Sequence, residues 1–168
     1  SRFADAAEGP HRLYDGEIAY MDHEIGRLLA TLPPATVVAA VGDHGEMLGE
    51  HGEMTHGLLP FAGARRVPFL IAGPGVPEGH VSPCLVRTAD LAPTLLDLAG
   101  VSLPSGLDGE SLLSAWSTSD RAACSRVSYS ESFLPYYAYK WYPLRTLSDG
   151  RALFLQAPSP SLFRLDED

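Results

Sequence analysis

Cysteine is scarce in this 168-residue sequence, and long apolar runs are absent from it. The two cysteines, Cys84 and Cys124, make neither a disulfide framework nor a cluster of metal ligands, so we expect two structural thiols. A membrane-spanning helix needs about 18 consecutive apolar residues. No run in the sequence approaches that length, so we expect no membrane segment in this chain, and the cellular compartment stays open.

Positive charge is also in short supply. Lysine and arginine number 12 against 21 acidic residues, which gives a net charge of -9. A negative surface repels phosphate backbones, so the composition excludes nucleic acid as a partner. Hydrophobic residues make up 45% of the chain and charged residues 20%, which is typical of a globular domain.

Apolar periodicity predicts an α/β core. Apolar residues at three- and four-residue spacing predict a helix over residues 14–32, which Pro33 and Pro34 end. Apolar runs at residues 36–41 and 67–72 predict two buried strands, and residues 88–100 predict a capped helix. This order indicates part of a mixed, mostly parallel sheet flanked by helices, which we assign to residues 1–115.

The remaining residues, 116–168, differ in character. Residues 116–126 are small and polar, typical of a linker or an exposed loop. Short strands are predicted at residues 127–131, 144–147 and 152–155, and a hairpin turn at residues 148–151 joins the last two. We therefore expect a small C-terminal antiparallel subdomain.

The stretch most typical of a functional site directly follows the first predicted strand. Residues 42–57 read GDHGEMLGEHGEMTHG, with three histidines and four acids among the glycines. An α/β sheet places its site in such loops at the ends of its strands. Asp43 and His44 can offer one oxygen and one imidazole nitrogen to a divalent cation, although two ligands are too few to hold a metal alone. The competing interpretation is ordinary capping of a turn.

Motifs throughout the chain resemble those of the sulfatase family, within the alkaline phosphatase superfamily. The segments that carry the resemblance are Tyr14–Ile18, Gly26–Leu29, Asp43–Gly57, Arg66–Phe69, Gly73–Gly75, Asp90–Leu96, Leu107–Leu112 and Ser161–Leu165. They arrive in the family's order and span almost the whole chain. The resemblance implies an alkaline phosphatase-like fold and hydrolysis of sulfuric esters, with a sulfate ester small molecule or a saccharide as substrate.

The resemblance also implies roles for individual residues. Asp43 and His44 match the late pair of metal ligands, which holds one divalent cation, calcium or magnesium first, with manganese or zinc as alternatives. Twelve residues after the second ligand the family places a cationic group, commonly lysine, on the substrate anion. His56 stands at that spacing as the catalytic and substrate-binding residue. This departure from lysine leaves the exact substrate open.

Other polar and aromatic residues have structural interpretations as well as functional ones. His51 either reaches the substrate anion or packs within its loop, and we favour packing. Glu46, Glu50 and Glu53 are expected to shape the loop. An aromatic cluster either lines a substrate mouth or, more commonly, packs the subdomain; its members are Phe133, Tyr136, Tyr137, Tyr139, Trp141 and Tyr142.

The family's nucleophile motif, Cys/Ser-x-Pro-x-Arg, does not occur in the sequence. We therefore expect a C-terminal portion of the enzyme, inactive alone, whose partner is the N-terminal half of the same chain. One alternative is a phosphoethanolamine transferase or phosphohydrolase of the same superfamily, which shares Asp-His-Gly-Glu. A second alternative is a non-catalytic binding domain.

Overall fold

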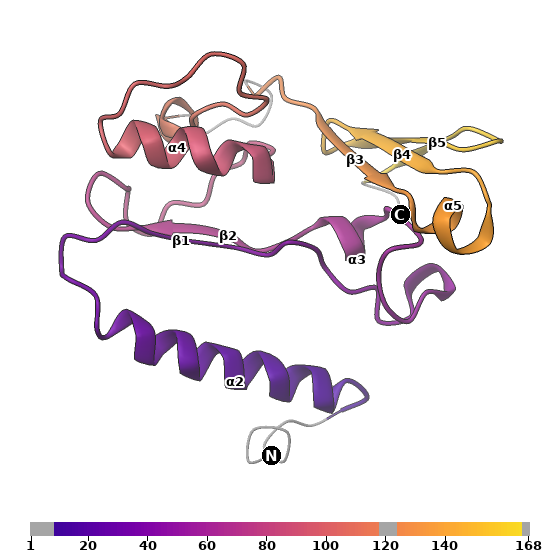
Figure 1. The fold of residues 1–168 in the computed structure, drawn as a ribbon, viewed down its shortest axis with the longest axis horizontal. Coiled ribbons are helices and arrows are strands. Elements are labelled where there is room, and N and C mark those ends of the chain that lie inside the picture. The colour runs from indigo at the N-terminus through magenta and orange to yellow at the C-terminus, as the bar shows by residue number, and fades with distance from the viewer. Residues whose placement is uncertain (1–8, 118–123, 166–168) are drawn as a thin grey trace. The chain divides into compact units, whose positions relative to one another are not determined.

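The computed structural model describes residues 9–117 and 124–165, so part of the predicted linker at 116–126 lies outside the described residues. The chain divides into two units, Ser1–Val37 and Val38–Asp168, and the predicted boundary between residues 115 and 116 stays a prediction. The elements are α2 (Arg12–Leu29), β1 (Val38–Val41), η1 (Glu50–Gly52), α3 (Ala62–Arg65), β2 (Phe69–Ala72), η2 (Thr88–Asp90), α4 (Leu91–Leu98), η3 (Leu113–Ser117), β3 (Ser128–Ser132), α5 (Leu134–Tyr139), β4 (Leu144–Ser148), β5 (Ala152–Gln156) and β6 (Ser161–Arg164) (Figure 1).

Helix α2 of the first unit confirms the predicted helix with shifted ends. It ends at Leu29 rather than at residue 32, because the chain tightens into a turn before the two prolines. In that turn the Thr31 N–H and side-chain hydroxyl both donate to the Leu28 carbonyl, at 3.0 and 2.7 Å. None of the described helices, α2 included, is long and apolar enough to cross a membrane.

Strands β1 and β2 form an antiparallel pair in which Val38 faces Ala72 and Val41 faces Phe69. The described residues thus contain two strands of the predicted mixed sheet, and these two are antiparallel neighbours. Strand β2 begins two residues later than expected because Pro68 has no N–H to donate. Its carbonyl instead accepts the Gly42 N–H at 3.1 Å, which fixes the start of the glycine-rich loop beside β2.

The C-terminal sheet contains four antiparallel strands in the order β3-β4-β5-β6 (orange to yellow in Figure 1). The predicted hairpin between β4 and β5 is confirmed, since Ser148 pairs with Leu153 across the turn. One sheet face is buried and carries Thr146, Ser148, Leu153 and Leu155. The other face presents a row of exposed apolar side chains, one from each strand: Tyr129, Leu147, Phe154 and Leu162.

Helix α4 follows a buried ionic cluster, the Asp90 cluster, defined as Asp90 with Arg87, Arg126 and Glu110. The fully buried Asp90 carboxylate accepts from Arg87 Nη2 at 2.8 Å and from the backbone N–H groups of Arg87 and Glu110 at 2.9 and 3.0 Å. Arg126 Nη2 lies 3.1 Å from the same carboxylate. Burial alone raises the pKa of Asp90, but the Arg87 hydrogen bond and the other donors lower it below its usual value.

The prediction of two structural thiols was wrong. Cys84 and Cys124 form a disulfide, with Cα atoms 5.4 Å apart and 40 residues apart in the chain. The bond lies two residues before Arg126 and three before Arg87, so it holds together the two segments that supply the arginines of the Asp90 cluster. Two cysteines so far apart in sequence give no local sign that the fold brings them together.

Candidate metal and anion site

The loop after β1 is held against α3 by a close backbone approach. The Gly45 N–H donates to the Ala64 carbonyl at 2.8 Å. A Cβ at residue 45 would lie 1.9 Å from the carbonyl oxygen of Gly63, so only glycine fits there. The Asp43–His44 turn is therefore fixed beside α3 by the sequence Asp-His-Gly itself.

Asp43 and His44 present two donor atoms to solvent on the same side of this turn. The Asp43 side chain is 90% exposed, and its Oδ2 lies 3.7 Å from His44 Nε2. The backbone N–H of His44, 3.0 Å from Asp43 Oδ1, is the main cause that lowers the pKa of Asp43, and the His44 ring adds to it. The carboxylate is thus ionised at neutral pH and has no arginine or lysine partner among the described residues.

The orientation of the His44 ring suits a metal ligand. Its Nδ1 lies 3.0 Å from the Gly45 carbonyl oxygen, which can only accept, so Nδ1 is placed to donate a hydrogen bond. Nε2, 3.7 Å from Asp43 Oδ2, is then the ring nitrogen left for a ligand. A histidine that ligates a metal typically donates its other ring N–H to a carbonyl or carboxylate in this way.

His56 is brought directly onto this pair from the far end of the loop. Its ring stacks on that of His44, with centroids 3.8 Å apart. His56 Nδ1 lies 3.2 Å from Glu46 Oε2, which orients the ring. The structure therefore brings together three of the four predicted site residues, Asp43, His44 and His56.

Glu53 fixes the segment that follows His56. Its carboxylate is only 5% exposed and accepts the backbone N–H groups of Leu58 and Leu59 at 2.9 and 2.8 Å. This confirms the expectation that Glu53 shapes the loop. The Ser132 hydroxyl donates to the Gly57 carbonyl, so the end of β3 also holds this segment.

A cavity of about 320 Å³, the His56 cavity, opens beside these groups. Its polar lining comes from the loop, α3, η2 and β3, and its members are Asp43, His44, His56, Arg65, Thr88, Ser130, Glu131 and Ser132. Among residues 9–117 and 124–165, no group of three or more His, Cys, Asp or Glu side chains is arranged to hold a metal. The chain thus offers Asp43 and His44 as two donors that fit a divalent cation in chemistry and orientation, and a complete shell needs further ligands.

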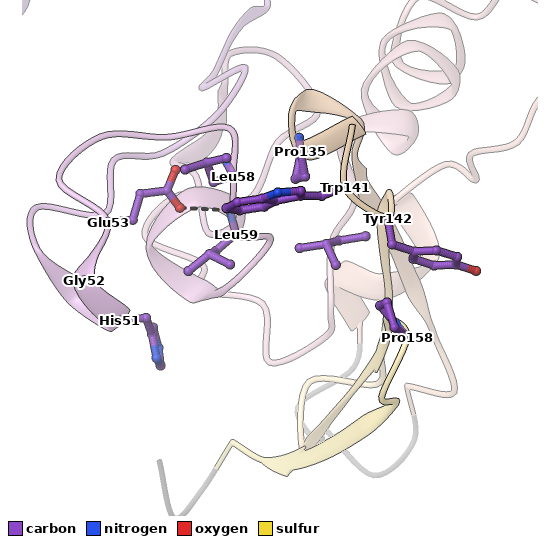
Figure 2. A pocket seen from close by; sticks show the side chains of 10 residues that line it. His51, Gly52, Glu53, Leu58, Leu59, Pro135, Trp141, Tyr142 and Pro158 are labelled. Carbon is purple, nitrogen blue, oxygen red and sulfur yellow. Dashed lines mark hydrogen bonds between the residues drawn. The ribbon is translucent and has the colours of Figure 1, made fainter. Parts of the chain in front are cut away.

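The fourth predicted residue, His51, lies in a different place. Its backbone adopts a positive φ of 51°, and its ring stacks on Phe61 with centroids 4.3 Å apart. It lines a second cavity of about 430 Å³, the Trp141 cavity, whose members come from residues 51–59 and from the C-terminal residues 135–158 (Figure 2). Leu59 lines both cavities, so the two are neighbours.

The aromatic cluster is partly packed and partly available. Tyr139 and Trp141 stack with ring centroids 4.9 Å apart, and Tyr136 meets Tyr137 edge to face. Trp141 is 62% exposed and lines the Trp141 cavity with Tyr142. Sequence reasoning missed the short helix α5 that carries three of these tyrosines, and it also missed Arg65 and the β3 serines as lining residues of the His56 cavity.

Comparison with known proteins identifies the class. The family model described as Sulfatase matches residues 2–101. The choline-sulfatase of Rhizobium meliloti (strain 1021) is 35% identical over 172 residues, covering 94% of this chain and 33% of that protein. The arylsulfatase of Clostridium perfringens is 39% identical over 108 residues, which are 59% of this chain and 22% of that protein. The chain belongs to the sulfatase family.

A solved structure gives the same fold. The structure of BT4656 in complex with its substrate D-glucosamine-2-N,6-O-disulfate superimposes with a TM-score of 0.78 at 24% identity, covering 94% of this chain and 34% of that one. The predicted alkaline phosphatase-like class with a C-terminal antiparallel subdomain is confirmed. The chain spans a third or less of the length of the curated relatives that it matches.

Proposed function

We propose that this chain supplies the late metal ligands and an anion-binding residue of a metal-dependent sulfuric ester hydrolase. Asp43 and His44 would hold one divalent cation, calcium or magnesium first, and His56 would contact the substrate anion. The observation that carries the proposal is the free Nε2 of His44, 3.7 Å from an ionised and exposed Asp43 carboxylate. Two ligands of one cation, each roughly 2.0–2.5 Å from it, lie at such a separation.

A divalent cation in this position supplies charge that polarises the oxygens of a sulfate ester and steadies a nucleophile. The chain's own residues have simpler tasks. The Gly45 carbonyl keeps the His44 proton on Nδ1. Glu46 keeps Nδ1 of His56 engaged, so that Nε2 of His56 is the ring atom available to a sulfate oxygen, to which it donates when protonated.

The substrate that we propose is the sulfate ester of a small molecule or a saccharide. The choline-sulfatase and arylsulfatase relatives, at 35% and 39% identity, support sulfate ester chemistry. Because the sequence holds no Cys/Ser-x-Pro-x-Arg motif and the described residues hold no group of three or more metal-ligand side chains, we propose that these 168 residues alone bind metal weakly and do not turn over sulfate esters. Their complement is the N-terminal half of the sulfatase fold. Turnover of an aryl sulfate by the purified 168-residue chain would contradict this.

The test of the ligand assignment is Asp43→Ala in the full-length protein, with metal content and aryl sulfate hydrolysis as the measurements. We expect bound divalent metal to fall and kcat/KM to drop by more than about 100-fold, because a ligand outweighs the second-shell partners whose loss costs about 10- to 100-fold. The matched control is Glu78→Ala, which removes another exposed carboxylate away from the site. A full metal complement and a near-normal rate in Asp43→Ala would overturn the assignment.

A further inference from the structure

Arg65 is a cation without a counter-charge on the wall of the His56 cavity. Its Nε atom is buried and has no hydrogen-bond partner, and its guanidinium forms no ion pair with any residue in the described parts of the chain. Burial, with a smaller contribution from Arg66, lowers the pKa of Arg65, yet a guanidinium stays protonated in proteins. A partly desolvated charge without a partner is costly, and a bound anion removes that cost.

The backbone ties Arg65 to the candidate metal turn. Arg65 ends helix α3, where its N–H donates to the Phe61 carbonyl at 3.0 Å. The preceding residue, Ala64, accepts the Gly45 N–H at 2.8 Å. One peptide therefore separates Arg65 from the contact that fixes the Asp43–His44 turn, and both line the cavity.

The other charged groups that line the cavity are matched or negative. Any positive charge on His56 is offset by Glu46, 3.2 Å away. Glu131 lies 3.7 Å from Arg145. Asp43 is negative. Among the described lining residues, Arg65 is thus the one permanent positive charge that no neighbouring carboxylate neutralises.

We infer that Arg65 binds the oxyanion of the substrate's sulfate group in the His56 cavity, supplying the fixed positive charge that a histidine at position 56 does not. The inference rests on the proposed function, because the anion is the sulfate of the ester to be hydrolysed. A guanidinium presents parallel N–H donors that match two oxygens of a tetrahedral anion. Thr88, Ser130 and Ser132, which also line the cavity, are neutral and add no repulsion.

The test measures binding of inorganic sulfate to the full-length protein by calorimetry, for wild type, Arg65→Gln, Arg65→Lys and Arg66→Gln. Losing a charge-assisted hydrogen bond costs about 1.5–3 kcal/mol, so we expect Arg65→Gln to raise the Kd about 10- to 100-fold with metal content unchanged. Arg65→Lys keeps the charge but not the fork and should lose severalfold. Arg66→Gln removes the neighbouring exposed arginine and should stay within about twofold, because an exposed charge is screened.

Each contrary outcome is decisive. An unchanged Kd in Arg65→Gln overturns the inference, as does an equal loss in Arg66→Gln, which would show a general field rather than a contact. If Arg65→Gln does not fold, Arg65→Lys decides, and wild-type affinity in that variant overturns the inference. Absence of sulfate binding by the wild type overturns it as well. If the wild type binds sulfate through Arg65 but hydrolyses no sulfate ester, this inference is supported and the proposed function is wrong.

Discussion

The second unit contains two ionic clusters that are built in opposite ways. In the Asp90 cluster, a fully buried carboxylate meets two arginines and two backbone N–H groups at 2.8–3.1 Å. At the His56 cavity, the Asp43 carboxylate is 90% exposed and the Arg65 guanidinium has no acidic partner among the described residues. Both aspartates have a lowered pKa, Asp43 through the backbone N–H of His44 and Asp90 through Arg87 against the effect of burial.

The difference lies in whether the charges are satisfied within the chain. A buried carboxylate whose every donor is supplied internally has no capacity left for a ligand, and its removal strands the arginines. An exposed carboxylate beside a free imidazole nitrogen and an unpaired guanidinium leaves both a cation and an anion position open. Lowered pKa values by themselves do not separate these cases; the partners do.

The largest expected effect comes from breaking the satisfied cluster. Asp90→Ala leaves Arg87 and the largely buried Arg126 with the exposed Glu110 carboxylate, 3.8 and 3.5 Å away, in place of their buried partner, so we expect the free energy of unfolding to fall by about 3–5 kcal/mol. Urea unfolding of the full-length protein measures this. Asp43→Ala, measured with the metal chelated, should leave the urea unfolding midpoint unchanged, as for other surface sites. Equal losses in the two variants would remove the contrast.

The Asp90 cluster also predicts how stability depends on acid. The pKa of Asp90 is lower in the folded state than the usual 3.8, so its stabilising contribution is present above that value. It is lost as pH falls through the lower, folded pKa. The stability difference between wild type and Asp90→Asn should therefore be constant from pH 7 to 5 and shrink below about pH 4. A difference that grows on acidification would show that the sign is wrong.

Removing the disulfide should cause a smaller loss of stability than Asp90→Ala. Closing a 40-residue loop between Cys84 and Cys124 restricts the unfolded chain, which typically contributes about 2–4 kcal/mol. The double variant Cys84→Ser/Cys124→Ser should lose that much stability in urea, and its metal content should match that of the wild type. Identical unfolding midpoints with and without a reductant would argue that the bond does not form.

Most of the fold could be predicted from apolar spacing, and the exceptions have physical causes. Helix α2, both core strands and the β4–β5 hairpin follow from periodicity and turn residues. Helix α5 (Leu134–Tyr139) was not predicted because its six residues, half of them tyrosines, carry no helical period. The final strand, Ser161–Arg164, is formed by pairing with β5 rather than by its own composition. The disulfide depends on a contact across 40 residues, which no local pattern encodes.

The residues of the candidate site also divide into those that the sequence could predict and those that it could not. Asp43, His44 and His56 could be chosen from the sequence because they lie in one glycine-rich loop at a motif spacing. Arg65 could not, because its place depends on the backbone bond between Gly45 and Ala64. The serines at 130 and 132 enter from a strand more than seventy residues further along. Local chemistry can be predicted from local sequence, whereas the walls of a cavity depend on the tertiary fold.

An effect of intermediate size tests whether the loop of residues 42–57 depends on the buried carboxylate of Glu53. Glu53→Gln replaces one of two acceptor oxygens by a donor facing the Leu58 and Leu59 N–H groups. We expect a stability loss of about 1–3 kcal/mol from the unsatisfied group. We also expect kcat/KM to fall about tenfold, because positioning His56 needs ångström accuracy. The neighbouring exposed Glu50→Gln is the matched control. Loss of stability with unchanged kcat/KM would mean that the Glu53 hydrogen bonds do not position His56.

The smallest effect isolates what makes Asp43 different from another exposed aspartate. Asp149 also has a pKa lowered by backbone N–H groups, those of Ala152 and Arg151, each 2.8 Å from Oδ1 in the hairpin turn. Asp149 has no imidazole partner among the described residues and lines neither the His56 cavity nor the Trp141 cavity, so we interpret it as turn chemistry. Asp149→Ala should cost about 0.5–1.5 kcal/mol of stability, the worth of an ordinary hydrogen bond, with metal content and kcat/KM unchanged. Asp149→Asn, whose amide oxygen still accepts, should restore most of that loss. Asn at position 43 keeps the same acceptor oxygen but not the charge of the ligand. Asp43→Asn should therefore lose bound metal, while Asp149→Asn should keep its metal content and nearly all of its stability. If the two variants behaved alike, Asp43 would be a capping residue like Asp149 and not a ligand.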